Sequence, residues 1–175
     1  MQKPQIQQNQ IYHIYNRGVN REPIFFKEKN WDYFLYKTFQ YFRSPYAEIL
    51  AYCLMPNHYH LLVNVLCQDF GIKVILPFST AYTKAINNQE HRVGPIFQGS
   101  YKFKQITTSE ELVYVSRYIH LNPVKAGLVR SPKDWAYSSY LDYIGERTGD
   151  NLKKDLVLDN FAEIENYRDF VENSN

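Results

Sequence analysis

Two histidines separated by a single residue, His58 and His60, carry the clearest chemical signal in the chain. They lie in the stretch 55–63, Met-Pro-Asn-His-Tyr-His-Leu-Leu-Val, where a Pro-Asn turn precedes residues that favour a strand. Alternate side chains leave the same face of a strand, so the two imidazoles start from Cα atoms roughly 7 Å apart and can close around one cation. The pair therefore predicts two of the three ligands of a metal site.

A second pair of side chains that could do chemistry, Tyr118 and Asn122, lies on a predicted helix. Thr108 and Glu111 form a capping-box pattern that opens this helix, and we expect the helix to stop at Pro123, because proline lacks an amide donor and restrains the residue before it. Side chains four residues apart lie on one side of a helix, so a hydroxyl nucleophile and an amide oxygen would be presented together. Each residue also has an ordinary interpretation, as a packing tyrosine and as a polar residue at a helix C-terminus.

The elements that must position these groups follow from hydrophobic periodicity. Strands are expected at residues 11–16, 48–55, 58–65 and 101–106, and helices at 28–42, at 78–90 and from Thr108 to Pro123. The short Pro56-Asn57 link makes the second and third strands antiparallel partners. We interpret the aromatic residues of the first helix as core rather than as a platform for base stacking.

The chain of 175 residues is long enough for one domain with its own core, so we expect a single domain over residues 1–175. Within it, a core of about residues 11–145 precedes an acidic helical tail of about residues 150–175. The tail is expected to dock through Leu156, Leu158, Phe161 and Ile164. Two cysteines make no disulfide framework. Because residues 1–10 are polar and Gln-rich and no later apolar run reaches bilayer length, we expect neither a signal peptide nor a membrane-spanning segment. A cytoplasmic location without membrane contact is therefore expected.

Positive charge is concentrated in the part of the chain that carries the histidines. Residues 1–135 hold 16 Lys/Arg against 9 Asp/Glu, whereas the remainder holds 4 against 9. Arg17 and Arg21 flank a turn with Gly and Asn, and the alternation of the fourth predicted strand places Lys102 and Lys104 on one face. Both pairs could neutralise phosphates. The ordinary interpretation is a solvated loop and an edge strand that lysines protect from aggregation.

Five stretches form an ordered set of motifs along the chain. They are 12–18 (Tyr-His-Ile-Tyr-Asn-Arg-Gly), 55–63, 97–102 (Phe-Gln-Gly-Ser-Tyr-Lys), 118–129 (Tyr-Ile-His-Leu-Asn-Pro-Val-Lys-Ala-Gly-Leu-Val) and 135–140 (Trp-Ala-Tyr-Ser-Ser-Tyr). Together, and in this order, they resemble the single-tyrosine HUH transposases, and most closely their REP-associated tyrosine transposase branch in the insertion-sequence transposase superfamily. Five ordered motifs are far more specific than a His-x-His pair, and the resemblance covers roughly residues 11–145.

This resemblance implies an α/β (α+β) fold, with a ferredoxin-like antiparallel sheet and packed helices. The implied activity is that of a DNA transposase, an endonuclease that cleaves and rejoins single-stranded DNA at hairpin-bearing ends through a 5′-phosphotyrosine intermediate. His58 and His60 match the HUH pair, Tyr118 matches the nucleophile, and Asn122 matches the polar third metal ligand. From charge and location, we expect DNA contacts from Arg17, Arg21, Asn57, Lys102 and Lys104.

The chemistry of phosphodiester cleavage agrees with these roles. A divalent ion held by two imidazoles and one amide keeps coordination positions for phosphate oxygens and water. Mg²⁺ or Mn²⁺ fits this task, and histidine ligands favour Mn²⁺. A phenol is a weak nucleophile until it is assisted, and the sequence does not identify the base. His120 lies about 200° around the helix from Tyr118, so we do not expect it to be that base.

Two other functions remain open on the sequence alone. A ferredoxin-like module could bind single-stranded DNA or RNA without chemistry, with His58 and His60 as structural residues. A zinc hydrolase would need another histidine or a carboxylate near the pair, and the sequence offers no obvious one. The oligomeric state is open as well: the resemblance accommodates a homodimer that shares active sites between subunits or a monomer, and the acidic tail could dock in cis or in trans.

Overall fold

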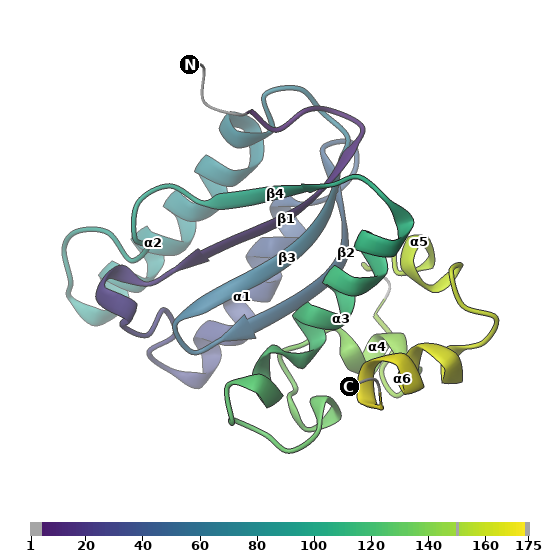
Figure 1. Ribbon diagram of the computed structural model, residues 1–175. Coiled ribbons are helices and arrows are strands. Elements are labelled where there is room, and N and C mark those ends of the chain that lie inside the picture. The colour runs from purple at the N-terminus through teal and green to yellow at the C-terminus, as the bar shows by residue number, and fades with distance from the viewer. Residues whose placement is uncertain (1–4, 150, 174–175) are drawn as a thin grey trace.

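An antiparallel sheet of four strands lies at the centre of residues 5–149 and 151–173, the parts of the chain that the computed structural model describes (Figure 1). Connections through one helix each join the first strand to the second and the third to the fourth, which is the ferredoxin-like arrangement. The predicted fold class is therefore confirmed. In spatial order the strands are β2 (Ala47–Met55), β3 (His58–Val65), β1 (Gln10–Arg17) and β4 (Lys102–Ile106).

The register of the two central strands assigns each side chain to one face of the sheet. β2 and β3 form the predicted hairpin across the Pro-Asn turn, with Met55 opposite His58. On the other side of β3, Tyr15 of β1 lies opposite His60, and Arg17 lies opposite His58. Because successive side chains of a strand point to opposite faces, the histidines share one face with Tyr15, and Tyr59 points to the other.

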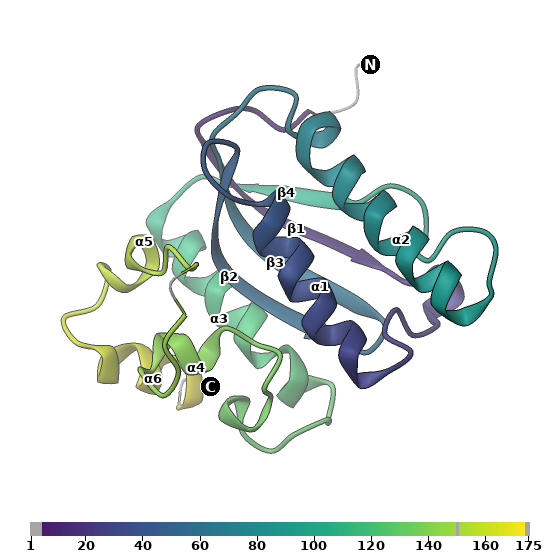
Figure 2. The same cartoon turned by 180° about the vertical axis from the view of Figure 1, so that it is seen from behind.

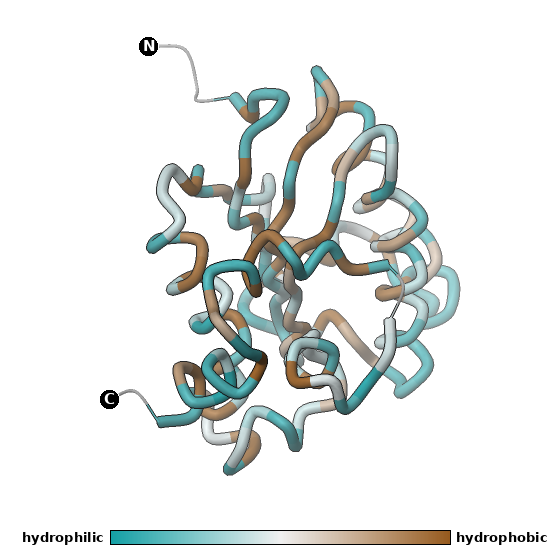
Figure 3. Tube along the Cα trace, turned by 90° about the vertical axis from the view of Figure 1, so that its right-hand side faces the viewer, coloured by the Kyte–Doolittle hydropathy of each residue, from teal (hydrophilic) through white to brown (hydrophobic). Residues whose placement is uncertain are grey.

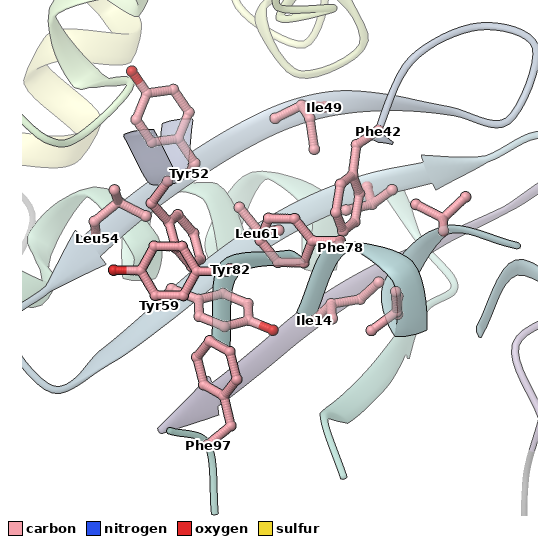
Figure 4. Close-up of a cluster of buried hydrophobic side chains, with 14 of the residues drawn as sticks. Ile14, Phe42, Ile49, Tyr52, Leu54, Tyr59, Leu61, Phe78, Tyr82 and Phe97 are labelled. Carbon is pink, nitrogen blue, oxygen red and sulfur yellow. The ribbon is translucent and has the colours of Figure 1, made fainter. Parts of the chain in front are cut away.

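One face of the sheet is covered by α1 (Glu28–Tyr41) and α2 (Leu76–Glu90), which run across it in Figure 2. The layer between helices and sheet is rich in aromatic rings (Figure 4). Phe34 of α1 lies at its centre, with ring centroids 5.1 Å from Tyr59 and 5.1 Å from Phe78. The interpretation of the α1 aromatics as core is therefore confirmed for the buried side of the helix, while Tyr36 on its outer side is exposed.

The second helix begins earlier than its apolar pattern indicates. A single π-helical turn, η2 (Gly71–Ile75), runs directly into α2, whose first residue is Leu76 rather than the predicted Phe78. Pro77 lies in the first turn, where its missing amide donor is not needed by the helix. Hydrophobic and hydrophilic residues alternate along the helical segments of the chain (Figure 3), as expected for amphipathic helices that pack on a sheet.

The other face of the sheet packs against α3 (Ser109–Lys125) at β2 and β3, and three short helices lie beside α3 (Figure 1). Thr108 caps α3 as predicted, because its Oγ1 accepts the Glu111 amide at 3.1 Å, and Glu111 reaches back to the Thr107 amide at 3.0 Å. The supporting helices are α4 (Tyr140–Tyr143), α5 (Asp155–Leu158) and α6 (Ile164–Glu172).

The prediction that this helix stops at Pro123 is wrong. Pro123 is buried inside α3, and the helix continues because the Ala126 amide still donates to the Asn122 carbonyl at 2.9 Å. The chain leaves the helix at Gly127, whose φ of 69° belongs to the left-handed region that glycine adopts without steric cost. Proline thus removes one hydrogen bond here without breaking the helix.

The acidic tail docks through two of the four residues that its pattern suggested. Leu158 and Phe161 are partly buried and pack against the core, whereas Leu156 and Ile164 are exposed. Val157, Tyr167 and Val171, which the pattern did not indicate, are buried against α3 and the sheet. The chain breaks between α5 and α6, so no single helical phase runs through the tail. Residues 150, 174 and 175 of the predicted tail lie outside the described residues.

A buried polar chain joins the tail to α3 and β2 through His120. Its Nδ1 lies 2.7 Å from the Tyr167 hydroxyl, and its Nε2 lies 2.8 Å from Oγ of Ser139. The Ser139 hydroxyl in turn accepts the Tyr52 amide of β2 at 2.9 Å. Burial, and to a lesser extent the Arg147 charge, lowers the pKa of His120 to about 3. His120 therefore belongs to the core.

Replacing His120 by glutamine is expected to flatten the acid side of the stability profile. In the unfolded chain this histidine gains a proton near its ordinary pKa of about 6.5, but in the folded protein it does so only near 3. Stability is therefore lost as the pH falls from 6.5 towards 3, and His120→Gln removes up to about 1.4 kcal/mol per pH unit of that slope. Urea unfolding between pH 7.5 and 4.5 measures it, and parallel curves for the two proteins would contradict the assignment.

Candidate active site

Side chains from three strands and α3 meet at a cavity of about 450 Å³. It lies where β1 ends and where β3 and β4 begin, because the antiparallel order brings these three strand ends to one edge of the sheet. The residues that line it are Tyr15, Asn16, Arg17, Arg21, Asn57, His58, His60, Gln98, Lys102 and Tyr118.

The two predicted metal ligands reach this cavity together. His58 and His60 have ring centroids 5.0 Å apart, with the ring planes at 89°. The Asn57 side-chain oxygen lies 2.6 Å from Nδ1 of His58, so it accepts the hydrogen on that nitrogen and leaves Nε2 as the lone-pair nitrogen. The predicted convergence of the two imidazoles is thus present in the geometry.

Tyr118 of the same chain stands beside the histidines. Its ring centroid is 5.5 Å from that of His60, and the side chain is 41% exposed, which leaves the phenol accessible. About two turns further along α3, Lys125 brings its ammonium group to 5.3 Å from the centre of the Tyr118 ring. A phenolic hydroxyl and a pair of imidazoles therefore face one cavity within one chain.

Asn122 does not join them in this conformation. Its side-chain nitrogen donates to the Tyr118 carbonyl at 2.8 Å, and the residue is absent from the cavity lining. An amide that folds back onto its own helix is a common local hydrogen bond near a helix C-terminus. The role of Asn122 as a third metal ligand stays a prediction.

Four of the five expected DNA contacts border the cavity, and one does not. Arg17, Arg21, Asn57 and Lys102 line it. Lys104 shares the face of Lys102 but forms an ion pair with Glu111 at the start of α3, with 2.6 Å between Nζ and Oε1. The alternation of the strand predicted the common face correctly, but the pairing of Lys104 depends on a helix that the strand pattern does not contain.

Sequence reasoning missed four residues of this region, His13, Tyr15, Asn16 and Gln98. The side-chain oxygen of Gln98 accepts a hydrogen bond from Nε of Arg17 at 2.8 Å. Nε2 of His13 lies 2.9 Å from Nδ1 of His60. His13 stands two positions before Tyr15 in the first strand, so their common face was readable. The register between β1 and β3 determines which residues of β3 lie beside His13 and Tyr15, and a local sequence pattern does not contain that register.

Burial keeps all three imidazoles in their neutral form at neutral pH. It lowers the pKa of His60 well below the ordinary value, with smaller effects from His13 and His58. Burial also lowers the pKa of His58, and burial together with the Lys104 charge lowers that of His13 to about 4. A neutral imidazole has the free lone pair that a metal ion binds.

The donor set fits a divalent cation with open coordination positions. Nε2 of His60 is buried and has no hydrogen-bond partner, a situation that costs about 1–3 kcal/mol for a buried polar atom. A cation between the two imidazoles would satisfy it. Among the described residues, no cluster of three histidine, cysteine or carboxylate side chains could hold a metal, so the strong third ligand that a zinc hydrolase requires is not found there.

Comparison with known proteins identifies the family. The family described as "Transposase IS200 like" matches residues 6–122, which include the histidine pair, Tyr118 and Asn122. The chain belongs to the IS200-like transposase family. The resemblance drawn from the five motifs is confirmed. Among the helices that the structure describes in this transposase, none combines the length and apolar character needed to cross a bilayer.

Individual relatives of the transposase agree with this assignment. A protein of Haemophilus influenzae, assigned by name to the REP-associated tyrosine transposases, is 31% identical over 117 residues, which span 57% of this chain and 66% of the relative. A solved structure of a REP-associated tyrosine transposase bound to a REP hairpin has a TM-score of 0.66 at 16% identity, covering 87% of this chain and 93% of that one. At that identity the likeness supports the fold.

Manganese is expected to raise the thermal midpoint of the transposase. A ligand that binds only the folded state at 100 times its Kd adds about 2.7 kcal/mol of stability, which corresponds to several degrees. The shift should vanish in His58→Ala and His60→Ala and persist in His91→Ala, which removes an exposed histidine remote from the cavity lining. Differential scanning fluorimetry measures all four proteins, and an undiminished shift in His60→Ala would exclude this nitrogen as a ligand.

Proposed function

We propose that this transposase cuts and rejoins single-stranded DNA next to a hairpin, with Tyr118 as the nucleophile. The observation that carries the proposal is the half-exposed Tyr118 ring beside His60, in a cavity with a basic rim. Membership of the IS200-like transposases supports DNA cleavage as the reaction class. The hairpin is proposed by analogy with the relative whose structure contains one.

In the proposed reaction, the Tyr118 oxygen attacks the phosphorus of one phosphodiester. A bond forms between the phenolic oxygen and phosphorus, the bond from phosphorus to the 3′ oxygen breaks, and the phenolic proton is released as the 3′ oxygen gains one. The product is a 5′-phosphotyrosine and a free 3′-hydroxyl. Because the phosphodiester energy is kept in the tyrosyl ester, a 3′-hydroxyl can reverse the step and rejoin strands without a nucleotide cofactor.

His58 and His60 would hold Mg²⁺ or Mn²⁺, with Asn122 as the proposed third ligand after its amide leaves the Tyr118 carbonyl. When bound, such an ion offsets the phosphate charge and stabilises the developing charge on the leaving oxygen. The chain's own contribution is to keep both imidazoles neutral through burial and to orient His58 through Asn57. Nitrogen ligands favour Mn²⁺ over Mg²⁺.

The basic rim would hold the DNA backbone across the cavity mouth. Arg17 and Arg21 come from the end of β1 and the following turn, and Lys102 comes from the first position of β4. Asn57 joins them, while its side-chain nitrogen donates to the Arg21 carbonyl at 3.0 Å and so ties the two turns together. These groups lie on three separate segments around one opening, an arrangement that can bind a single DNA strand running across the edge of the sheet.

Changing Tyr118 to phenylalanine is expected to abolish a covalent protein–DNA adduct. Wild-type protein, a labelled hairpin oligonucleotide with a single-stranded flank and Mn²⁺ should give a band that survives denaturing electrophoresis. Tyr114→Phe is the matched control, because Tyr114 is an exposed tyrosine one turn earlier on α3, and it should form the adduct at the wild-type level. If Tyr118→Phe still forms the adduct, or if wild type forms none while binding the hairpin, the nuclease assignment fails and a binding module remains.

The two lysines of β4 are expected to differ in their effect on DNA affinity. Lys102→Gln should lower the slope of log K against log salt by about 0.7–0.9, the value for one lost phosphate contact. Lys104→Gln should change the slope far less, because Lys104 is already paired with Glu111. Fluorescence anisotropy of a labelled hairpin between 50 and about 200 mM salt measures both. Equal slope changes would mean that the ion pair opens when DNA binds.

A further inference from the structure

We propose that His13 is a positioning residue that fixes the tautomer of His60, so that Nε2 of His60 presents a lone pair to the cavity. The inference rests on the proposed function for the identity of the ligand, a divalent cation. It goes beyond that function because His13 is not among the residues that line the cavity and has no part in the proposed reaction itself.

The contact is built into the sheet. His13 on β1 lies opposite Leu62 of β3, two positions along the ladder from the pair formed by Tyr15 and His60, and therefore on the same face of the sheet. Its Nε2 approaches Nδ1 of His60 to 2.9 Å, with the two ring planes inclined by 27°. Both side chains are buried, with 8% of His13 and 5% of His60 exposed. Water is therefore a poor substitute for either partner.

A hydrogen bond between two neutral imidazoles needs one hydrogen and one lone pair, so only two arrangements exist. If His13 donates, His60 carries its own hydrogen on Nε2, which is then a buried N–H without an acceptor. If His60 donates from Nδ1, its Nε2 is instead a lone pair. Buried N–H groups without an acceptor are rare in folded proteins, so the second arrangement is favoured. It is also the arrangement in which Nε2 can bind a cation.

The same histidine contacts the proposed nucleophile. The ring of His13 meets the Tyr118 ring edge-on at 5.9 Å, and it packs against Tyr15 at 5.1 Å. His13 thus stands behind His60 and Tyr118 at once, which suits a residue that sets their orientation. Metal-bound histidines in other proteins usually donate their second ring nitrogen to a fixed acceptor in this way, and loss of the acceptor weakens metal binding.

Two variants separate orientation from simple packing. His13→Phe keeps a planar ring of similar size but removes the acceptor nitrogen. His13→Gln removes the ring but offers a side-chain oxygen that can accept from Nδ1 of His60. A purely structural role predicts that phenylalanine is the milder change, whereas the proposed role predicts that glutamine is.

The deciding experiment uses the full chain without metal. Long-range ¹⁵N–¹H NMR reports which nitrogen of His60 carries hydrogen. We expect hydrogen on Nδ1 in the wild type and in His13→Gln, and a mixture with hydrogen on Nε2 in His13→Phe. A wild-type spectrum with hydrogen on Nε2 overturns the inference by itself, whatever the variants do and whether or not they fold.

The second readout is the affinity for Mn²⁺, which is measured from the electron paramagnetic resonance signal of the free ion. His13→Phe should bind Mn²⁺ about 10–100-fold more weakly than the wild type, and His13→Gln within a few-fold of it. An unchanged affinity and an unchanged His60 tautomer in folded His13→Phe would refute the positioning role. If the wild type itself binds no Mn²⁺, the proposed metal site fails, while the NMR result still decides the role of His13.

Discussion

The antiparallel register between β1 and β3 is the constraint on which the site depends. It places His58 opposite Arg17 and His60 opposite Tyr15, so imidazoles and basic rim share one face. A shift by one residue would turn both histidines into the aromatic layer and expose Tyr59 in their place. That shift is opposed by burial, since placing one large apolar side chain in the core contributes about 1.5–3 kcal/mol and Tyr59 is 1% exposed. The core therefore specifies the site from the far side of the sheet.

A second constraint is the orientation in which α3 packs on the sheet, because it turns one face of the helix to the core and another to the cavity. His120 and Ile119 are buried, and Tyr118 beside them in sequence is half exposed. The hydrogen bonds of His120 to Tyr167 and Ser139 tie this turn of the helix to α6 and, through Ser139, to β2. Tyr118 therefore lies on a helix that this polar chain ties to β2, the hydrogen-bonded neighbour of the strand that carries His58 and His60.

Much of this arrangement was predictable from local sequence, and the rest was not for identifiable reasons. The strand 58–65 was predicted with its observed bounds, because a turn signal precedes an uninterrupted β-forming run. The predicted helix end at Pro123 was wrong because a helix can continue past a proline when the amides that follow it still donate to their carbonyl partners, as the Ala126 amide does to Asn122. His13 was missed because its partner is 47 residues away, and the ion pair of Lys104 was missed because it joins two elements. Local sequence patterns predict which residues share a face of one strand or helix, whereas contacts between residues of different elements are set only when the sheet and its helices assemble.

The nearness of Tyr118 to His60 within one polypeptide has a kinetic consequence. When both partners of a reaction centre belong to the same chain, their encounter is completed by folding and is independent of dilution. Each molecule then carries the Tyr118 phenol and the two imidazoles at a fixed local concentration, so under the proposed function the turnover per molecule would stay constant as the protein becomes scarce. Such an enzyme would suit a cell that holds only a few copies of it.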